Sequence, residues 1–213
     1  AKGVASVLLG VGGIGLVLTL LGAFGVNLAH ALAAYKVGVF TALACCLGAW
    51  FLVMVLHATN SYWATTIRRQ LENIMGLTWL PVLLIAPIVV IEIAAGGVLM
   101  TWMLEQKDGT FLIEHKAGYL AEGFFVLRYI ICAAIWVPIT RQLLSFSKQQ
   151  DITGDRFLSA KMRRLSCIGL LLFAMSVPFA AFDHLMSMDY RFFSTMWGVY
   201  YFAGAIMSGV ALS

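Results

Sequence analysis

The side chains most able to do chemistry in this sequence are ionisable residues inside long apolar stretches. Glu92 lies in the run IVVIEIAAGG, which offers no cationic neighbour in sequence. A charge in such surroundings is costly, so a residue of this kind usually faces a partner or a water-filled cavity. Two roles stay open for Glu92: a proton relay or hydrogen-bond partner of a quinone, or a neutral carboxyl group bonded to a neighbouring helix.

Arg128 and the pair Asp183-His184 form a second set. A buried guanidinium needs a carboxylate or carbonyl groups, and Glu122, Asp183 and Glu92 are the candidate partners of Arg128. A structural ion pair is the favoured role for this arginine. Asp183 and His184 precede a segment rich in Met and aromatic residues, which suits either a pocket for a quinol head group or an aromatic belt at a membrane interface. The belt is the favoured interpretation of that segment.

Sequence motifs for the common redox cofactors are missing. There is no Cys-x-x-Cys-His motif for covalent haem, no cysteine cluster for an iron–sulfur centre and no phosphate-binding loop. The histidines His30, His57, His115 and His184 fall at expected depths that do not match for a bis-histidine haem. We therefore expect no redox cofactor and no metal held by the chain itself, with quinol or quinone as a candidate ligand at Asp183 and His184.

Composition identifies the surroundings in which these residues act. Of the 213 residues, 62% are hydrophobic and only 11% are charged, against about 25% charged in a soluble domain. This composition excludes an ordinary water-soluble enzyme, a disordered protein and a nucleic-acid-binding protein. The net charge of +4 is too small to indicate a polyanionic partner.

Six apolar stretches are long enough to cross a bilayer core of about 30 Å as helices. They predict an all-α fold: a polytopic transmembrane bundle of about six spans, forming one domain over residues 1–213 with a four-helix bundle and flanking helices. The expected spans are residues 3–25, 35–56, 78–103, 119–146, 164–182 and 193–213, with a long loop at 147–163.

The distribution of Lys and Arg predicts the orientation. Near the expected span ends, nine of these residues fall on the side of the amino terminus and five on the other side. Because cytoplasmic loops carry the excess of positive charge, we expect a cytoplasmic amino terminus, with residues 183–192 outside.

Three stretches resemble a known family. They are HATNSYWATTIRRQLE at 57–72, HKAGYL at 115–120 followed by FFVLR at 124–128, and FDHLMSMDYRFFSTMWGVYYFAG at 182–204. In order and spacing they are similar to the ActF-type integral membrane subunit of bacterial alternative complex III, a quinol:cytochrome c (or other acceptor) oxidoreductase. That subunit is related to the NrfD/polysulfide-reductase membrane group.

The resemblance implies a larger protein of about ten spans, of which this chain is the amino-terminal part. It also implies a multi-subunit complex in the bacterial inner membrane, in which this subunit scaffolds the assembly and conducts protons. The implied partners are an NrfD-like quinol-binding subunit, a multihaem cytochrome c, an iron–sulfur subunit and lipids, so that haem c and the clusters reside in partners.

By position, the resemblance also implies a candidate proton path, which includes Glu92, Glu122, Arg128, Asp183 and His184. Family members often carry Trp where this sequence has His184. Two other functions stay open: a catalytic quinone-binding subunit and a secondary transporter.

Overall fold

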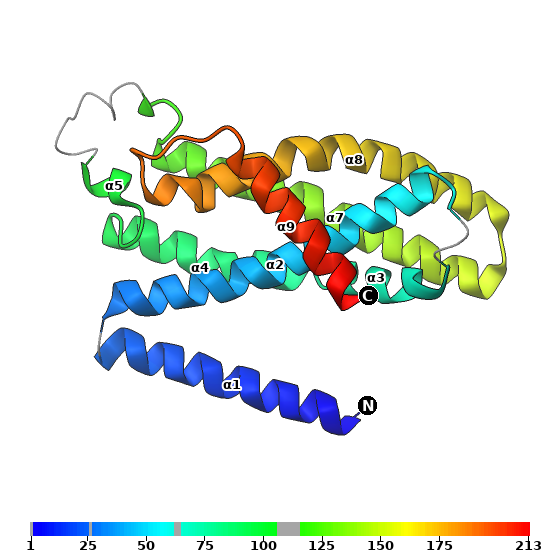
Figure 1. Cartoon of the computed structure of the whole chain (residues 1–213), viewed down its shortest axis with the longest axis horizontal. Helices are drawn as coiled ribbons and strands as arrows, with labels where there is room; N and C mark the ends of the chain where they lie inside the picture. Colours follow the sequence, from blue (N-terminus) through cyan, green and yellow to red (C-terminus); the bar gives the residue numbers. More distant parts are fainter. Residues whose placement is uncertain (1, 26, 62–64, 106–115) are drawn as a thin grey trace.

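The computed structural model describes residues 2–25, 27–61, 65–105 and 116–213. Within these ranges every regular element is helical, so the predicted all-α class is confirmed (Figure 1). The elements are α1 (Lys2–Gly25), α2 (Leu28–Ala58), α3 (Thr65–Gly76), α4 (Trp79–Ala95), α5 (Thr101–Glu105), α7 (Glu122–Thr153), α8 (Arg156–His184), the 3₁₀ turn η1 (Met186–Met188) and α9 (Trp197–Leu212).

Four helical segments of the described chain are long and apolar enough to cross a membrane: α2, α3 joined to α4, α7 and α8. The chain is therefore a membrane protein, although six spans is more than this structure supports. Two shorter apolar segments correspond to the other expected spans, one in α1 and one formed by α9. With 16 residues, α9 is about 24 Å long, which is less than the thickness of a bilayer core.

Two predicted boundaries are wrong. The expected loop at 147–163 is almost entirely helical, because α7 continues to Thr153 and α8 begins at Arg156. Gly154 adopts a left-handed conformation (φ 66°) between them, and the Asp155 side chain caps α8 by accepting from the backbone N–H of Phe157 at 2.8 Å. The expected span at 78–103 ends early as well, because Gly96 and Gly97 (φ 70° and 102°) terminate α4 at Ala95.

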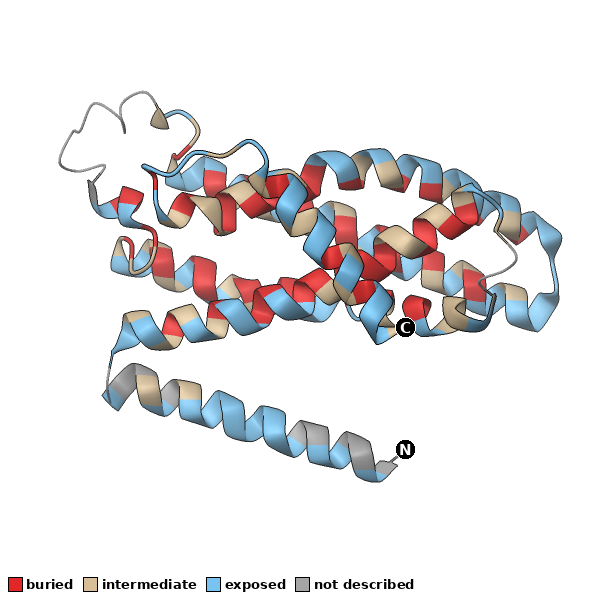
Figure 2. Cartoon of the chain, viewed as in Figure 1, coloured by how far each residue is buried: buried red, intermediate tan, exposed pale blue. Residues whose placement is uncertain are grey.

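The four long segments close into a ring in which α2 packs against α4 and α8, and α7 packs against the same two helices. Helix α2 also contacts α1, α3 and α9, and its central residues are the most deeply buried (Figure 2). The core of the ring contains large apolar side chains, including Trp50, Met54, Phe173 and Val177.

The ring has two ends, which we name by the elements found there. At the η1 end lie the beginnings of α2 and α7, the ends of α4 and α8, and η1 (Figure 1). At the turn end lie α3, the end of α2 and the turn between α7 and α8.

Helix α9 crosses α2 at a contact between two glycines. A Cβ atom on Gly48 would overlap the backbone carbonyl of Ala205, and a Cβ on Gly209 would lie 2.7 Å from the backbone nitrogen of Ala49. The two backbones therefore touch, as small residues allow in membrane helices.

Replacing either glycine should separate α9 from α2. We expect Gly48→Ala and Gly209→Ala each to reduce the free energy of unfolding by about 1–3 kcal/mol, the usual effect of overpacking. Denaturant titration in detergent, followed by circular dichroism, measures the loss. Gly204→Ala on the same helix is the control, because a Cβ there meets no atom within 4 Å and its stability should stay equal or rise slightly. Equal stability of all three variants would contradict the close crossing.

Candidate functional site

An ion pair between α7 and α8 forms the centre of the η1 end. Arg128 Nε donates to Asp183 Oδ2 at 2.6 Å, and Arg128 Nη1 donates to the backbone carbonyl of Tyr119 at 3.0 Å. The side chains of Arg128 and Asp183 are only 10% and 3% exposed. Of the three candidate carboxylates, Asp183 is thus the partner of Arg128, as the structural-pair interpretation requires.

Two aromatic rings enclose the Arg128 guanidinium. Its central carbon lies 4.0 Å from the ring centre of Tyr119 and 4.4 Å from that of Phe124, within cation–π distance. Burial, together with the nearby Asp183 carboxylate, raises the pKa of the Tyr119 phenol above its ordinary value. Tyr119 therefore keeps its proton, and its buried hydroxyl has no hydrogen-bond partner in the described part of the chain.

His184 is buried beside this pair among aromatic rings. Its ring centre lies 5.1 Å from that of Phe125 and 5.3 Å from that of Phe40. Nδ1 has no hydrogen-bond partner in the described part of the chain. His184 also borders a cavity of about 10 Å³, which is about the volume that one water molecule requires.

Glu92 lies in the last turn of α4 rather than in the middle of a span, and it is fully buried. Its carboxylate accepts from the backbone N–H groups of Val98 at 2.9 Å, Leu99 at 3.0 Å and Met100 at 3.2 Å. The hydrogen-bond partners of this carboxyl therefore lie in the chain that follows α4, not on a neighbouring helix as one interpretation assumed. Three backbone donors suit an acceptor-only carboxylate and favour a structural role for Glu92.

Lys36 is a buried cation that the sequence analysis did not select. It is 2% exposed, its Nζ has no hydrogen-bond partner among the described residues, and it interacts electrostatically with Glu92 and His184. The helical spacing of the sequence contained a signal for the burial of Lys36, because Lys36 falls on the same face of α2 as the buried residues Leu32 and Phe40.

Glu122 lies apart from this group. It is exposed in the first turn of α7, where a carboxylate is stabilised by the helix dipole. Of the candidate path residues, the fold thus brings together Arg128, Asp183 and His184, with Glu92 linked to them through Lys36.

A third buried carboxylate, Glu72, organises the turn end and was also missed. It is 1% exposed, and it receives Arg68 Nε at 3.1 Å, Arg69 Nη1 at 3.0 Å and the Ser147 hydroxyl at 2.7 Å. His57 Nε2 lies 3.9 Å away, and Arg69 also pairs with Asp151. The spacing of two arginines three and four residues before Glu72 was the sequence signal for this cluster.

Helix α7 connects the two clusters. Arg128 and Ser147 both lie on its buried face, nineteen residues apart, a distance of about 28 Å along the axis. Polar groups lie between them: Trp136 Nε1 donates to Ser176 Oγ at 2.8 Å, and Thr140 Oγ1 donates to the carbonyl of Trp136 at 2.8 Å. The two buried ion clusters are thus separated by about the thickness of a bilayer core.

The candidate quinone residues do not border the first of two cavities at the η1 end. That cavity, of about 310 Å³, is lined by residues of 116–120, of the end of α8 and of 186–195, but by neither Asp183 nor His184. In the residues that the structure describes, no group of three or more His, Cys, Asp or Glu side chains is placed to hold a metal ion.

The fold and these clusters define a membrane-embedded all-α bundle with buried charges at both ends. Neither a scan against protein-family models nor a search of curated proteins found a match to this chain.

Removing one member of the Arg128–Asp183 pair should reduce the free energy of unfolding far more than removing both. We expect Asp183→Ala to reduce the free energy of unfolding by about 3–5 kcal/mol, because it leaves a buried guanidinium without its carboxylate. The double variant Arg128→Met/Asp183→Leu should recover most of that loss. Denaturant unfolding in detergent measures both, and Glu122→Ala serves as an exposed control that stays within about 0.5 kcal/mol of wild type. A double variant no more stable than Asp183→Ala would contradict the pairing.

Glu92→Gln tests whether this carboxyl is structural. The amide keeps the size but places N–H groups against backbone N–H donors, so we expect a loss of about 1–3 kcal/mol and faster hydrogen exchange at Val98, Leu99 and Met100. Glu92→Leu should reduce the free energy of unfolding further. Hydrogen exchange by mass spectrometry resolves the segment. A Gln variant with wild-type stability and exchange, but without proton-coupled turnover, would instead support the relay role.

Proposed function

We propose that the chain is a membrane subunit of a quinol:electron-acceptor oxidoreductase complex of the alternative complex III type, which scaffolds the assembly and conducts protons. The observation that carries the proton role is the pair of buried ion clusters at opposite ends of α7. Ionisable groups inside membrane proteins usually mark ion or proton pathways. The resemblance of residues 57–72, 115–128 and 182–204 to the ActF-type subunit supports the complex.

In this proposal each end of the bundle exchanges protons with one side of the membrane. At the η1 end, Asp183 accepts the proton. Arg128 stabilises the ionised form of Asp183, and the Tyr119 hydroxyl orients the Asp183 carboxylate. His184 provides a second acceptor beside the water-sized cavity. At the turn end, Glu72 and His57 have the equivalent tasks. Glu92 and Glu122 lie outside this route, because one is bound to backbone and the other is exposed.

Charge supports an orientation with the amino terminus in the cytoplasm, and the bacterial inner membrane is the location that the resemblance implies. The amino terminus lies toward the turn end (Figure 1). The helices of that end carry six exposed cations: Arg141, Lys148, Arg156, Lys161, Arg163 and Arg164. A positive end of this kind faces the cytoplasm in most membrane proteins.

Electron transfer belongs to partner subunits in this proposal. An NrfD-like subunit binds quinol, and haem c and iron–sulfur clusters reside in a multihaem cytochrome and an iron–sulfur protein. In its scaffold role the chain contacts these partner subunits through the apolar outer surface of the bundle. Val11, Ile14 and Leu18 of α1 belong to this surface, and all three are more than half exposed.

Purification of the tagged chain from its native membrane in mild detergent tests the assignment. We expect stoichiometric redox subunits identified by mass spectrometry, a c-type haem spectrum and quinol-dependent reduction of an electron acceptor. Tyr119→Phe should assemble normally and reduce proton-coupled turnover severalfold, because the ring that stacks on Arg128 stays and the hydroxyl near Asp183 is lost. Glu122→Gln should leave turnover unchanged. A chain that purifies without redox partners would refute the assignment.

A further inference from the structure

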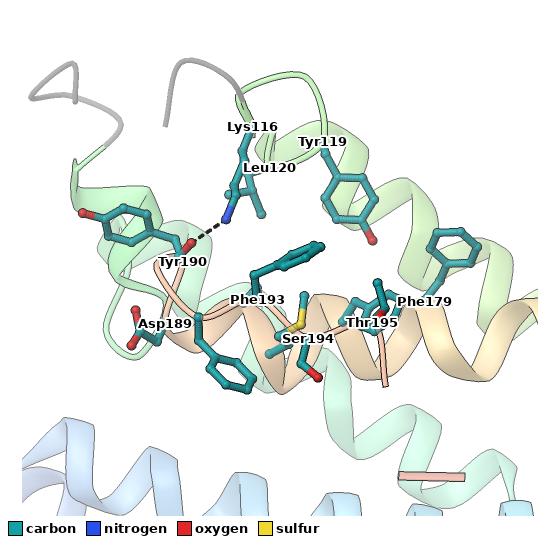
Figure 3. A pocket seen from close by; sticks show the side chains of 13 residues that line it. Lys116, Tyr119, Leu120, Phe179, Asp189, Tyr190, Phe193, Ser194 and Thr195 are labelled. Atoms are coloured by element: carbon teal, nitrogen blue, oxygen red, sulfur yellow. Dashed lines mark hydrogen bonds between the residues drawn. The ribbon is translucent and has the colours of Figure 1, made fainter. Parts of the chain in front are cut away.

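Two adjacent cavities lie at the η1 end and share two lining residues. The first, of about 310 Å³, lies among Lys116, Tyr119, Asp189, Tyr190 and Phe193 (Figure 3). The second, of about 360 Å³, runs between α7 and α8 and is lined mainly by apolar side chains, among them Ile131, Ile135 and Leu172. Tyr119 and Phe179 line both cavities, so the first cavity, which is mainly apolar but has the charged residues Lys116 and Asp189 in its lining, adjoins the apolar second one.

The first cavity contains opposite charges that do not pair with each other. Lys116 Nζ donates to the carbonyl of Tyr190 at 2.7 Å, which uses one of its three N–H groups. Asp189 is exposed and accepts from the backbone N–H of Arg191 at 3.0 Å. Among the ion pairs of the described residues, none joins Lys116 to Asp189. The cavity is therefore suited to a ligand that carries one charge of each sign.

The position of the cavities matches the boundary between hydrocarbon and water. The first cavity lies where α8 ends and before α7 begins, and the ring of Trp197 lies 5.5 Å from that of Phe192 in its lining. Tryptophan is enriched at the depth of the membrane interface. The second cavity continues from it along the membrane-spanning parts of α7 and α8, with Met175 and Ile131 exposed on its walls.

We propose that these two cavities bind one phospholipid with a phosphoethanolamine head group. The phosphate binds Lys116 through its remaining N–H groups, the primary ammonium donates to the Asp189 carboxylate, and an acyl chain lies between α7 and α8. An anionic lipid meets repulsion from Asp189, and a choline head group has no N–H to donate to it. The aromatic rings around Asp189 add attraction for the ammonium. This assignment is independent of the proposed respiratory function.

Lipid binding to the delipidated, detergent-solubilised full chain, measured by native mass spectrometry, tests the site. Phosphatidylethanolamine, phosphatidylcholine and phosphatidylglycerol with identical acyl chains are the probes. We expect phosphatidylethanolamine to bind about tenfold more tightly than either of the others. Equal binding of all three lipids, or preference for phosphatidylglycerol, would overturn the proposal. Displacement of phosphatidylethanolamine by decylubiquinone would also overturn it, because the cavity would then bind a neutral ring.

Two conservative variants locate the binding to this cavity. Lys116→Gln keeps a donor for the Tyr190 carbonyl, and Asp189→Asn keeps an acceptor for the Arg191 N–H, so both variants should fold. Each should weaken phosphatidylethanolamine binding about tenfold, and Asp189→Asn should also reduce the preference over phosphatidylcholine. Lys148→Gln, an exposed cation of the turn end, is the matched control and should bind like wild type. Wild-type binding by Lys116→Gln and Asp189→Asn would place the lipid elsewhere.

Discussion

A charged side chain left unpaired in an apolar interior lowers stability by several kcal/mol, and this constraint determines how both ends of the bundle are built. At the η1 end Arg128 pairs with Asp183 across α7 and α8, while Glu92 binds the backbone after α4. At the turn end Glu72 joins α3 to α7 through Ser147. Each pairing also holds two segments of the chain together. The interactions that stabilise the buried charges therefore also stabilise the packing of the helices.

The same constraint makes α7 the element on which the proposed proton conduction depends. Its buried face reaches both ion clusters, and the hydrogen bonds of Trp136 and Thr140 occupy the interval between them. Helix α2 contributes Lys36 at one end and His57 at the other, whereas α9 contacts α2 through Gly48 and through one hydrogen bond, from the Tyr201 hydroxyl to the carbonyl of Phe40 at 3.1 Å. The bundle therefore separates the helices that carry charge from the helix that only covers the core.

The all-α class was predictable from the sequence, because the length of each apolar stretch corresponds to the part of a helix that lies in the hydrocarbon of the membrane. The ends of α7 and α8 were not, because residues 147–153 and 156–163 are polar and still form helix outside that layer. Gly96-Gly97 was a visible signal for the end of α4, but the backbone donors that bind Glu92 have no sequence signature. Sequence offered three carboxylates for Arg128, and only the packing of α7 on α8 selects Asp183.

The two ends differ in their access to water, and this difference bears on the proposed proton conduction. The arginines around Glu72 are 29% and 38% exposed, so solvent reaches the edge of that cluster. Asp183 is 3% exposed and is paired with Arg128, whose guanidinium packs against the rings of Tyr119 and Phe124. Proton exchange at the η1 end therefore requires movement of that aromatic cover, whereas the turn end needs only side-chain rotation at its surface. In the proposed function the slower proton exchange therefore belongs to the η1 end, beside the segment 186–195 whose residues line the cavity of about 310 Å³.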